Sequence, residues 1–201
     1  MSSDNSRVLV LFDVDGTITR RDTMFDFIKF YWGTSAFYRG MIRLLPVLVL
    51  FKLGVIPNWK AKERMLSHFF AQEPAERFQQ QGDRYARQRL PKIVKESALR
   101  KIREFNERQA DIYLVSASAE NWLRGWSDSL GIRLIATQLD VEKGKITGKI
   151  TGNNCHGHEK VARIKSEIDL SQYDQIYGYG DSPGDQPMLA LTNFPHYRVF
   201  Q

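Results

Sequence analysis

Cysteine is nearly missing from this chain, which has only Cys155 among its 201 residues. One thiol cannot form an internal disulfide, so a reducing compartment is the natural setting for the protein. A site built from several thiolates is also excluded, and His156 and His158 nearby are more typical of a loop than of a transition-metal site. Residues 1–7 lack an apolar run of the signal-peptide type, so we expect a cytoplasmic protein.

Acidic residues are absent between Asp26 and Glu63, and the six basic residues in that stretch equal the formal net charge of the whole chain, +6. These residues are Lys29, Arg39, Arg43, Lys52, Lys60 and Lys62. Such charge attracts phosphate-rich partners, including nucleic acid. Here, however, the cations alternate with an apolar run and do not line a polar face. We therefore expect no nucleic-acid partner.

An uninterrupted apolar run of membrane-spanning length is missing too. Residues 41–56 are largely apolar, but Arg43 and Lys52 interrupt them, whereas a spanning helix needs about 20 mostly apolar residues. Two interpretations fit. In the first, residues 37–59 form an interfacial segment on an anionic membrane, where each basic residue adds about 1 kcal/mol to the binding free energy. In the second, they form a buried helical hairpin that is kinked at Pro46.

What the chain does have is an apolar run, Val8-Leu9-Val10-Leu11-Phe12, that leads directly into Asp13-Val14-Asp15-Gly16-Thr17. A continuous apolar run is typical of a strand in a parallel sheet, and ligands gather at the carboxyl ends of such strands. Carboxylates at positions i and i+2 share a face, and their repulsion implies a bound divalent cation or a shared proton. Both suit phosphoryl chemistry, although an acidic turn is the simpler alternative.

The distribution of strands predicts an α/β fold with a doubly wound, Rossmann-like parallel sheet. We expect strands near residues 8–12, 112–116, 133–136 and 175–179. Residues 21–95 have helical patterns throughout, so we expect them to form a helical cap inserted after the first strand. Residues 1–20 and 96–201 would then form the catalytic core. Residues 144–152 alternate β-branched residues between glycines, which predicts a hairpin or flap.

Four segments of the chain resemble, in order, the four motifs of the haloacid dehalogenase (HAD) superfamily. They are residues 13–17, 112–118, 157–162 and 176–185. A helical cap directly after the first motif resembles subfamily IB, the phosphoserine-phosphatase-like branch. The resemblance implies a phosphoric monoester hydrolase, because the dehalogenase branch usually lacks the second acid, which is Asp15 here.

The resemblance also implies roles for individual residues. Asp13 would be the nucleophile that forms an aspartyl-phosphate, and Asp15 the general acid and base. Ser116 would bind a phosphoryl oxygen, and Lys160 would neutralise the charge on the phosphate and on Asp13.

A magnesium site is implied as well. Asp181 resembles the metal carboxylate of the family and Asp185 a supporting one, with Asp13 and the main-chain carbonyl of Asp15 as further ligands. Mg²⁺ suits such a set because it is held by few carboxylates together with water and substrate oxygens.

The substrate stays open at this level. The region around residues 155–162 and the apolar segment in the cap resemble HAD phosphatases of the bacterial phosphatidylglycerophosphatase C type, which implies a phosphomonoester on a lipid headgroup, reached from the cytoplasmic leaflet. A soluble phosphatase of the phosphoserine type is the alternative, in which Asp22 would bind the substrate amine, unless Asp22 is only a helix N-cap. A phosphate-binding regulator without turnover is a third reading, which the intact set of acids and lysine disfavours. The sequence leaves the oligomeric state open.

Overall fold

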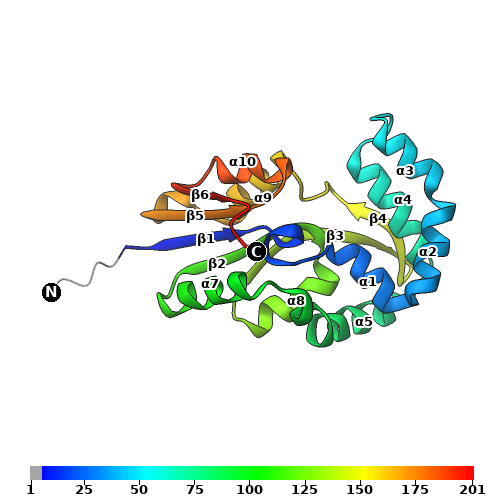
Figure 1. Cartoon of the computed structure of the whole chain (residues 1–201), viewed down its shortest axis with the longest axis horizontal. Coiled ribbons are helices and arrows are strands. Elements are labelled where there is room, and N and C mark those ends of the chain that lie inside the picture. The colour runs from blue at the N-terminus through cyan, green and yellow to red at the C-terminus, as the bar shows by residue number, and fades with distance from the viewer. Residues whose placement is uncertain (1–5) are drawn as a thin grey trace.

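The computed structural model describes residues 6–201. The prediction about a signal peptide concerned residues 1–7, of which residues 1–5 lie outside the described part. Within it, six strands form one sheet in the order β4-β3-β2-β1-β5-β6 (Figure 1). The strands are β1 (Val8–Phe12), β2 (Asp111–Ala119), β3 (Arg133–Glu142), β4 (Lys145–Thr151), β5 (Gln175–Gly180) and β6 (Phe194–Tyr197). All neighbouring pairs are parallel except β3 and β4. The predicted parallel α/β sheet is confirmed, with one antiparallel strand at its edge.

β1 lies in the middle of the sheet and is buried on both faces, as its continuous apolar run predicts. Val8, Val10 and Phe12 belong to one hydrophobic cluster, whereas Leu9 and Leu11 belong to another on the opposite face. Because successive side chains of a strand point to opposite faces, this run supplies both layers of the core. The carboxyl end of β1 is thereby held rigidly.

Two strands depart from the expected bounds. β3 continues well past residue 136, because its second half leaves the parallel sheet and pairs with β4. Residues 144–152 were predicted to form a hairpin or flap by themselves, but they contain one strand, β4, whose hairpin partner is β3. β6 was not predicted at all. It is a short, largely exposed edge strand that contains Pro195 and lacks an apolar run.

Six helices lie within residues 21–95, the segment that follows β1 and precedes α7. They are α1 (Thr23–Trp32), α2 (Thr34–Arg43), α3 (Leu45–Lys52), α4 (Asn58–Phe70), α5 (Ala75–Gln88) and α6 (Leu90–Ile93). Pro46, Pro57, Pro74 and Pro91 lie where α3, α4, α5 and α6 begin, the position where a missing N–H costs least. Asp22 is the N-cap of α1, and its carboxylate accepts the N–H of Phe25 at 3.0 Å.

The remaining helices cover the two faces of the sheet (Figure 1). They are α7 (Glu96–Glu107), α8 (Glu120–Ser129), α9 (His158–Glu167) and α10 (Gln186–Leu189). The inserted helices rest on α8, where Phe27 of α1 stacks on Trp122 with ring centroids 4.9 Å apart. Asp26 is buried in the same region and accepts two hydrogen bonds from Arg89, both of 2.8 Å. The base of the inserted segment is thus packed firmly against the sheet-bearing part.

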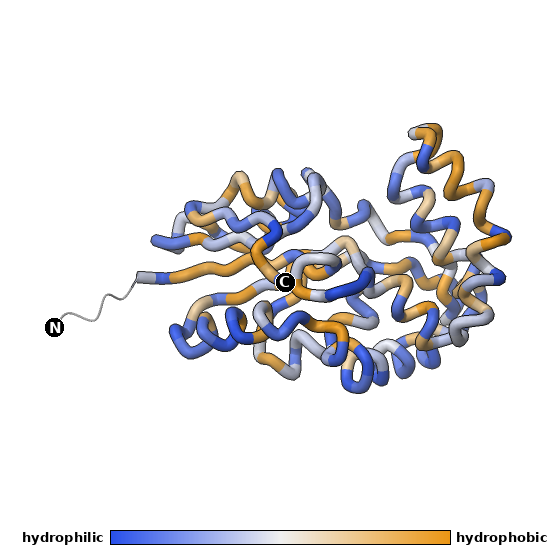
Figure 2. Tube along the Cα trace, in the orientation of Figure 1, coloured by the Kyte–Doolittle hydropathy of each residue, from blue (hydrophilic) through white to orange (hydrophobic). Residues whose placement is uncertain are grey.

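The far end of the inserted segment is different. α2 and α3 meet at 62°, and no residue of α3 is buried, so the buried-hairpin interpretation does not hold for α3. Figure 2 shows that this projecting end is largely hydrophobic along its trace. Among the described residues, no single helix has both the length and the apolar composition needed to cross a membrane. Within residues 6–201, only α2 and α3 taken together, as a bent pair, have this length and composition.

Candidate active site

The chain turns sharply immediately after β1. Gly16 has a φ of 82°, a left-handed conformation that favours glycine, and a Cβ at this position would collide with the carboxylate of Asp181. Glycine is therefore required for both reasons. The turn presents Asp13 and Asp15 at the carboxyl end of the sheet, next to the end of β5.

Asp13 is buried and both of its oxygens accept hydrogen bonds. Oδ1 accepts one from Nζ of Lys160 at 2.6 Å and Oδ2 one from the hydroxyl of Thr17 at 2.9 Å. Burial raises the pKa of Asp13 to about 7, although the charge of Lys160 opposes this rise. Burial alone would lower the pKa of Lys160, but Asp13 and Asp185 raise it above its usual value, so Lys160 is an ammonium ion.

Asp185 shares Lys160 with Asp13, because its Oδ1 also accepts a hydrogen bond of 2.6 Å from Nζ. Its Oδ2 accepts hydrogen bonds from the N–H and hydroxyl of Ser182, at 2.9 and 2.7 Å. Burial would raise the pKa of Asp185, but Lys160 outweighs it and holds that pKa below its usual value. Asp185 is therefore ionised and fixed in place.

Asp181 completes a cluster of three acids. It accepts a hydrogen bond of 3.1 Å from Thr17, and burial raises its pKa. One carboxylate oxygen from each of Asp13, Asp181 and Asp185 lies within 4.8 Å of the other two. Three such oxygens at this spacing fit Mg²⁺, which takes hard oxygen ligands.

The carboxylate of Asp15 turns toward the inserted helices. One oxygen accepts the N–H of Thr23 at 2.6 Å, and the other accepts the hydroxyl of Ser118 at 2.6 Å. Ser116 is fully buried, and its hydroxyl accepts the N–H of Ser118 and lies 3.5 Å from Asp15. Ser118 lines the cavity and Ser116 does not. Sequence reasoning missed Ser118, although its position two residues along the same strand places it on the same side.

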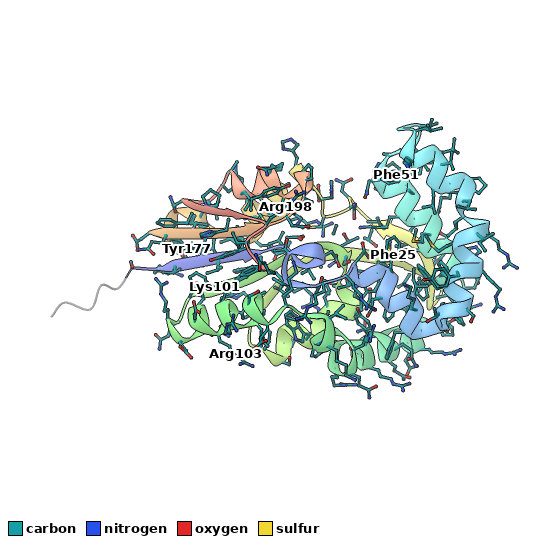
Figure 3. The ribbon with its side chains drawn as sticks, viewed as in Figure 1. Phe25, Phe51, Lys101, Arg103, Tyr177 and Arg198 are labelled. Atoms are coloured by element: carbon teal, nitrogen blue, oxygen red, sulfur yellow. The ribbon has the colours of Figure 1, made fainter. Side chains whose placement is uncertain are left out.

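A cavity of about 230 Å³ lies over these residues. Its floor comes from the sheet-bearing part, with Asp13, Asp15, Ser118, Lys160, Ser182 and Asp185. Its opposite wall comes from the inserted helices, with Met24, Phe25, Leu48, Phe51 and Met65. Phe25 and Phe51 are labelled in Figure 3, where both belong to the helices on the far side of the molecule from the N-terminus. The cavity floor is thus mainly polar, whereas the inserted segment contributes these apolar side chains together with the polar Asp22, Asn58 and Lys62.

Lys62 is the one basic residue of α4 that reaches this cavity, among the residues the structure describes. Its ammonium donates to the carbonyl of Ala117 and to Oδ1 of Asn154, both at 3.0 Å. Burial lowers the pKa of Lys62, while the charges of Asp15 and Asp22 oppose that effect. Sequence reasoning saw Lys62 only as part of a basic stretch, because its spacing does not distinguish it from its neighbours.

Asp22 lies beside Lys62 in the lining of the cavity. The residue is exposed as a whole, but burial of its carboxyl group and the charge of Asp15 raise its pKa to about 6. It caps α1 and lines the cavity at the same time, so the two roles considered for it are compatible.

Comparison with known proteins gives a consistent picture. A family model described as haloacid dehalogenase-like hydrolase matches residues 10–190. Protein CicA of Caulobacter vibrioides is 29% identical over 196 residues, which cover 96% of this chain and 87% of CicA.

Two solved structures share the fold. A protein of unknown function from Bordetella pertussis Tohama I has a TM-score of 0.80 at 24% identity, covering 95% of this chain and 89% of that one. A substrate-bound phosphoserine phosphatase has a TM-score of 0.63 at 22% identity, covering 96% of this chain and 87% of that one. At these identities the two structures support the fold alone.

Proposed function

Because the chain belongs to the haloacid dehalogenase-like hydrolase family, we propose that this hydrolase cleaves phosphomonoesters through a covalent intermediate on Asp13. The observation that carries the proposal is the buried pair of Asp13 and Lys160, 2.6 Å apart at the floor of the cavity. A carboxylate held against a fixed cation, with a second acid two residues away, is what attack on phosphorus and proton transfer require. In this proposal residues 21–95 are the cap, and residues 1–20 and 96–201 are the catalytic core.

The reaction has two steps. In the first, a carboxylate oxygen of Asp13 bonds to phosphorus, the bond from phosphorus to the leaving oxygen breaks, and Asp15 gives its proton to that oxygen. In the second, Asp15 takes a proton from water as the water oxygen attacks phosphorus, which releases phosphate and restores Asp13. The hydrogen bond from Ser118 orients the carboxyl group of Asp15 for both transfers.

Lys160 and the hydroxyl groups at the end of β2 would stabilise the transition state. Since its two acidic partners raise the pKa of Lys160, it stays charged at any pH at which the enzyme works. Its ammonium can then neutralise the phosphoryl oxygens as charge develops on them. Ser118 lines the cavity directly. The hydroxyl of Ser116 lies outside the cavity lining and accepts a hydrogen bond from the backbone N–H of Ser118, which fixes the position of Ser118.

Asp13, Asp181 and the main-chain carbonyl of Asp15, with Asp185 in support, would hold Mg²⁺. A bound Mg²⁺ supplies positive charge to the phosphoryl group and favours the ionised form of Asp13. The Lys160 contact keeps Asp185 from protonating, and the Thr17 hydroxyl bridges Asp13 and Asp181, so the acids stay aligned.

The substrate that we propose is a phosphate on a lipid headgroup, such as phosphatidylglycerophosphate, presented at the cytoplasmic face of an anionic membrane. The apolar wall of the cavity and the exposed apolar helix α3 beside it support this choice. A soluble ester of the phosphoserine type is the second candidate. Asp22 and Lys62 favour it, because opposite charges in one cavity can pair with an amine and a carboxylate.

The test is phosphate release from phosphatidylglycerophosphate in mixed micelles, phosphoserine and a generic aryl phosphate, each with Mg²⁺ and with chelator. Metal-dependent turnover that is lost in Asp13→Asn supports the proposed chemistry. Preference for the micellar lipid supports the lipid substrate, and preference for phosphoserine replaces it with the soluble one. Phosphate binding without turnover of any ester would point to a regulator instead.

A further inference from the structure

The helix α3 presents apolar side chains in two directions. Leu48 and Phe51 line the active-site cavity, whereas Val49 and Leu53, just past the helix end, are 52% and 71% exposed. No residue of α3 is buried, and none makes a side-chain hydrogen bond within residues 6–201. We call residues 42–59, which comprise α3, the turn after it and their immediate flanks, the cap tip.

The apolar surface of the cap tip is too large to be incidental. Apart from Phe51, which lines the cavity, its exposed members are Ile42, Leu45, Val49, Leu50, Leu53, Val55 and Trp59, with exposures between 42% and 71%. Transfer of apolar side chains out of water is favourable, so leaving a group of them exposed is costly. A contiguous exposed apolar patch of this kind marks an interaction surface.

The charges around the patch select among partners. Arg39, Arg43, Lys52 and Lys60 are all exposed beside it, and acidic residues are absent from Asp26 to Glu63. Exposed Tyr38 and Trp59 stand near its two ends, where the amphipathic aromatic rings suit a membrane–water boundary. Apolar side chains interleaved with cations match the interface of an anionic bilayer, in which acyl chains lie beneath anionic headgroups.

We propose that the cap tip inserts into the interface of an anionic phospholipid bilayer, and that α3 is then a wall shared by the bilayer and the active-site cavity. The outer face of α3 contacts lipid, while Leu48 and Phe51 on its inner face contact the substrate. The role of this inner face rests on the proposed function, whereas the docking of the outer face does not. A lipid whose phosphate reaches Asp13 could keep its acyl chains beside α3 and would not have to leave the bilayer.

Vesicle flotation of the full chain tests the docking directly. We expect the wild type to float with vesicles of phosphatidylglycerol and phosphatidylcholine and to float much less with phosphatidylcholine alone. The double variant Val49→Asp and Leu53→Asp should lower the partition coefficient by about tenfold or more, because two carboxylates now face the acyl region. Val141→Asp is the control for placing a carboxylate at an exposed apolar position, since Val141 is 49% exposed on β3 and lies outside the cap tip.

Turnover measurements separate docking from catalysis. The double variant should hydrolyse a soluble aryl phosphate as the wild type does, because neither residue lines the cavity. Leu48→Ala should float like the wild type. Relative to the wild type, its turnover of the micellar lipid should fall several-fold more than its turnover of the aryl phosphate.

Three results would overturn the proposal. One is a wild type that does not float with anionic vesicles, and another is a double variant that floats as well as the control. The third is self-association without lipid that the double variant abolishes, which would assign the surface to a second copy of the chain. If the wild type does not hydrolyse the aryl phosphate, this result would instead contradict the proposed function and leave the flotation result standing.

Discussion

The floor of the proposed active-site cavity and the tip of the proposed cap are built in opposite ways. At the floor, Lys160 is fully enclosed and bonded to two carboxylates at 2.6 Å, and each of those carboxylates has further donors. At the tip, α3 has no buried residue. Phosphoryl transfer needs groups fixed to fractions of an ångström, whereas a surface that meets varied partners needs few internal constraints.

Between these extremes lies the base of the cap, which is as firmly packed as the core. Phe27, Tyr85 and Trp122 form an aromatic cluster there, beside the buried Asp26–Arg89 ion pair. The inserted segment is thus anchored at this end, whereas at the tip only Val47 and Leu48 of α3 are partly buried against the core and the rest of α3 is exposed. Substitutions at the floor should therefore affect every substrate, those at the base should affect stability, and those on the cap side of the cavity should affect selected substrates.

The largest effect is expected from Asp13→Asn at the floor. We expect turnover of lipid and soluble esters alike to fall by at least about 1,000-fold, because an amide does not attack phosphorus as a carboxylate does. Lys160 keeps Asp185 as a partner, so the circular dichroism melt should stay within a few degrees of the wild type. Phosphate release measures the loss, and turnover within tenfold of wild type would refute Asp13 as the nucleophile.

Arg89→Met at the base should affect stability more than chemistry. It leaves the buried carboxylate of Asp26 with only the Tyr85 hydroxyl and the more distant guanidinium of Arg21, 3.9 Å away. Because the side chain of Arg89 is 35% exposed, we expect the free energy of unfolding to fall by about 2–3 kcal/mol, less than for a fully buried pair. Urea unfolding measures this loss. Arg87→Met, at an exposed position in the last turn of α5, two residues before Arg89, is the control and should change stability by less than about 0.5 kcal/mol. Equal effects of the two variants would contradict the structural role of the ion pair.

Lys62→Met on the cap side should discriminate between substrates. For an ester with a second anionic group, we expect kcat/KM to fall by about tenfold, mainly through KM, because a charge-assisted contact is lost. An aryl phosphate, which lacks that group, should change by less than about threefold. Lys60→Met, exposed on the same helix, controls for general loss of charge. An equal loss on both substrates would place Lys62 in the chemistry instead.

Asp22→Asn should give the smallest effect, and one that depends on pH. Since the folded state raises the pKa of Asp22 from 3.8 to about 6, its contribution favours folding below pH 3.8 and is lost as the pH rises through 6. Asparagine caps α1 equally well but carries no charge. With chelator present, the variant should be more stable than wild type at pH 8, by less than about 1 kcal/mol because solvent screens this exposed residue.

Urea unfolding at pH 4.5 and pH 8 measures that difference. At pH 4.5 Asp22 is largely protonated in the folded protein, whereas the unfolded carboxyl, with a pKa of 3.8, is largely ionised. The advantage of the variant should therefore shrink to a fraction of its value at pH 8. An advantage of the same size at both pH values would show that charge is not its cause.

The predictable parts of the fold are those in which neighbouring residues carry the information. The apolar run of β1, the alternation in residues 144–152 and the prolines at helix starts all indicated structure locally. β6 was missed because its position at the edge depends on β5 and not on a pattern of its own. The second half of β3 was missed because it depends on pairing with β4.

The site shows the same division. Motif order alone singled out Asp13, Lys160, Asp181 and Asp185. The structure brings these residues together although the first and the last are 172 positions apart in the chain. Ser118 and Lys62 were missed, since only the packing of the cap over β2 places them in the cavity. Ser116, chosen by motif, lies beneath Ser118.

The sequence by itself determined the α/β class, the sheet end at which the acids gather and the excess of positive charge in the cap. These follow from local backbone preferences, strand alternation and a count of charges. Only the tertiary structure decided that Lys62 and Asp22 face one cavity and that α3 is exposed on its outer side. Burial is the physical reason, because whether a side chain meets water or protein depends on segments far away in the chain, and no local pattern specifies them.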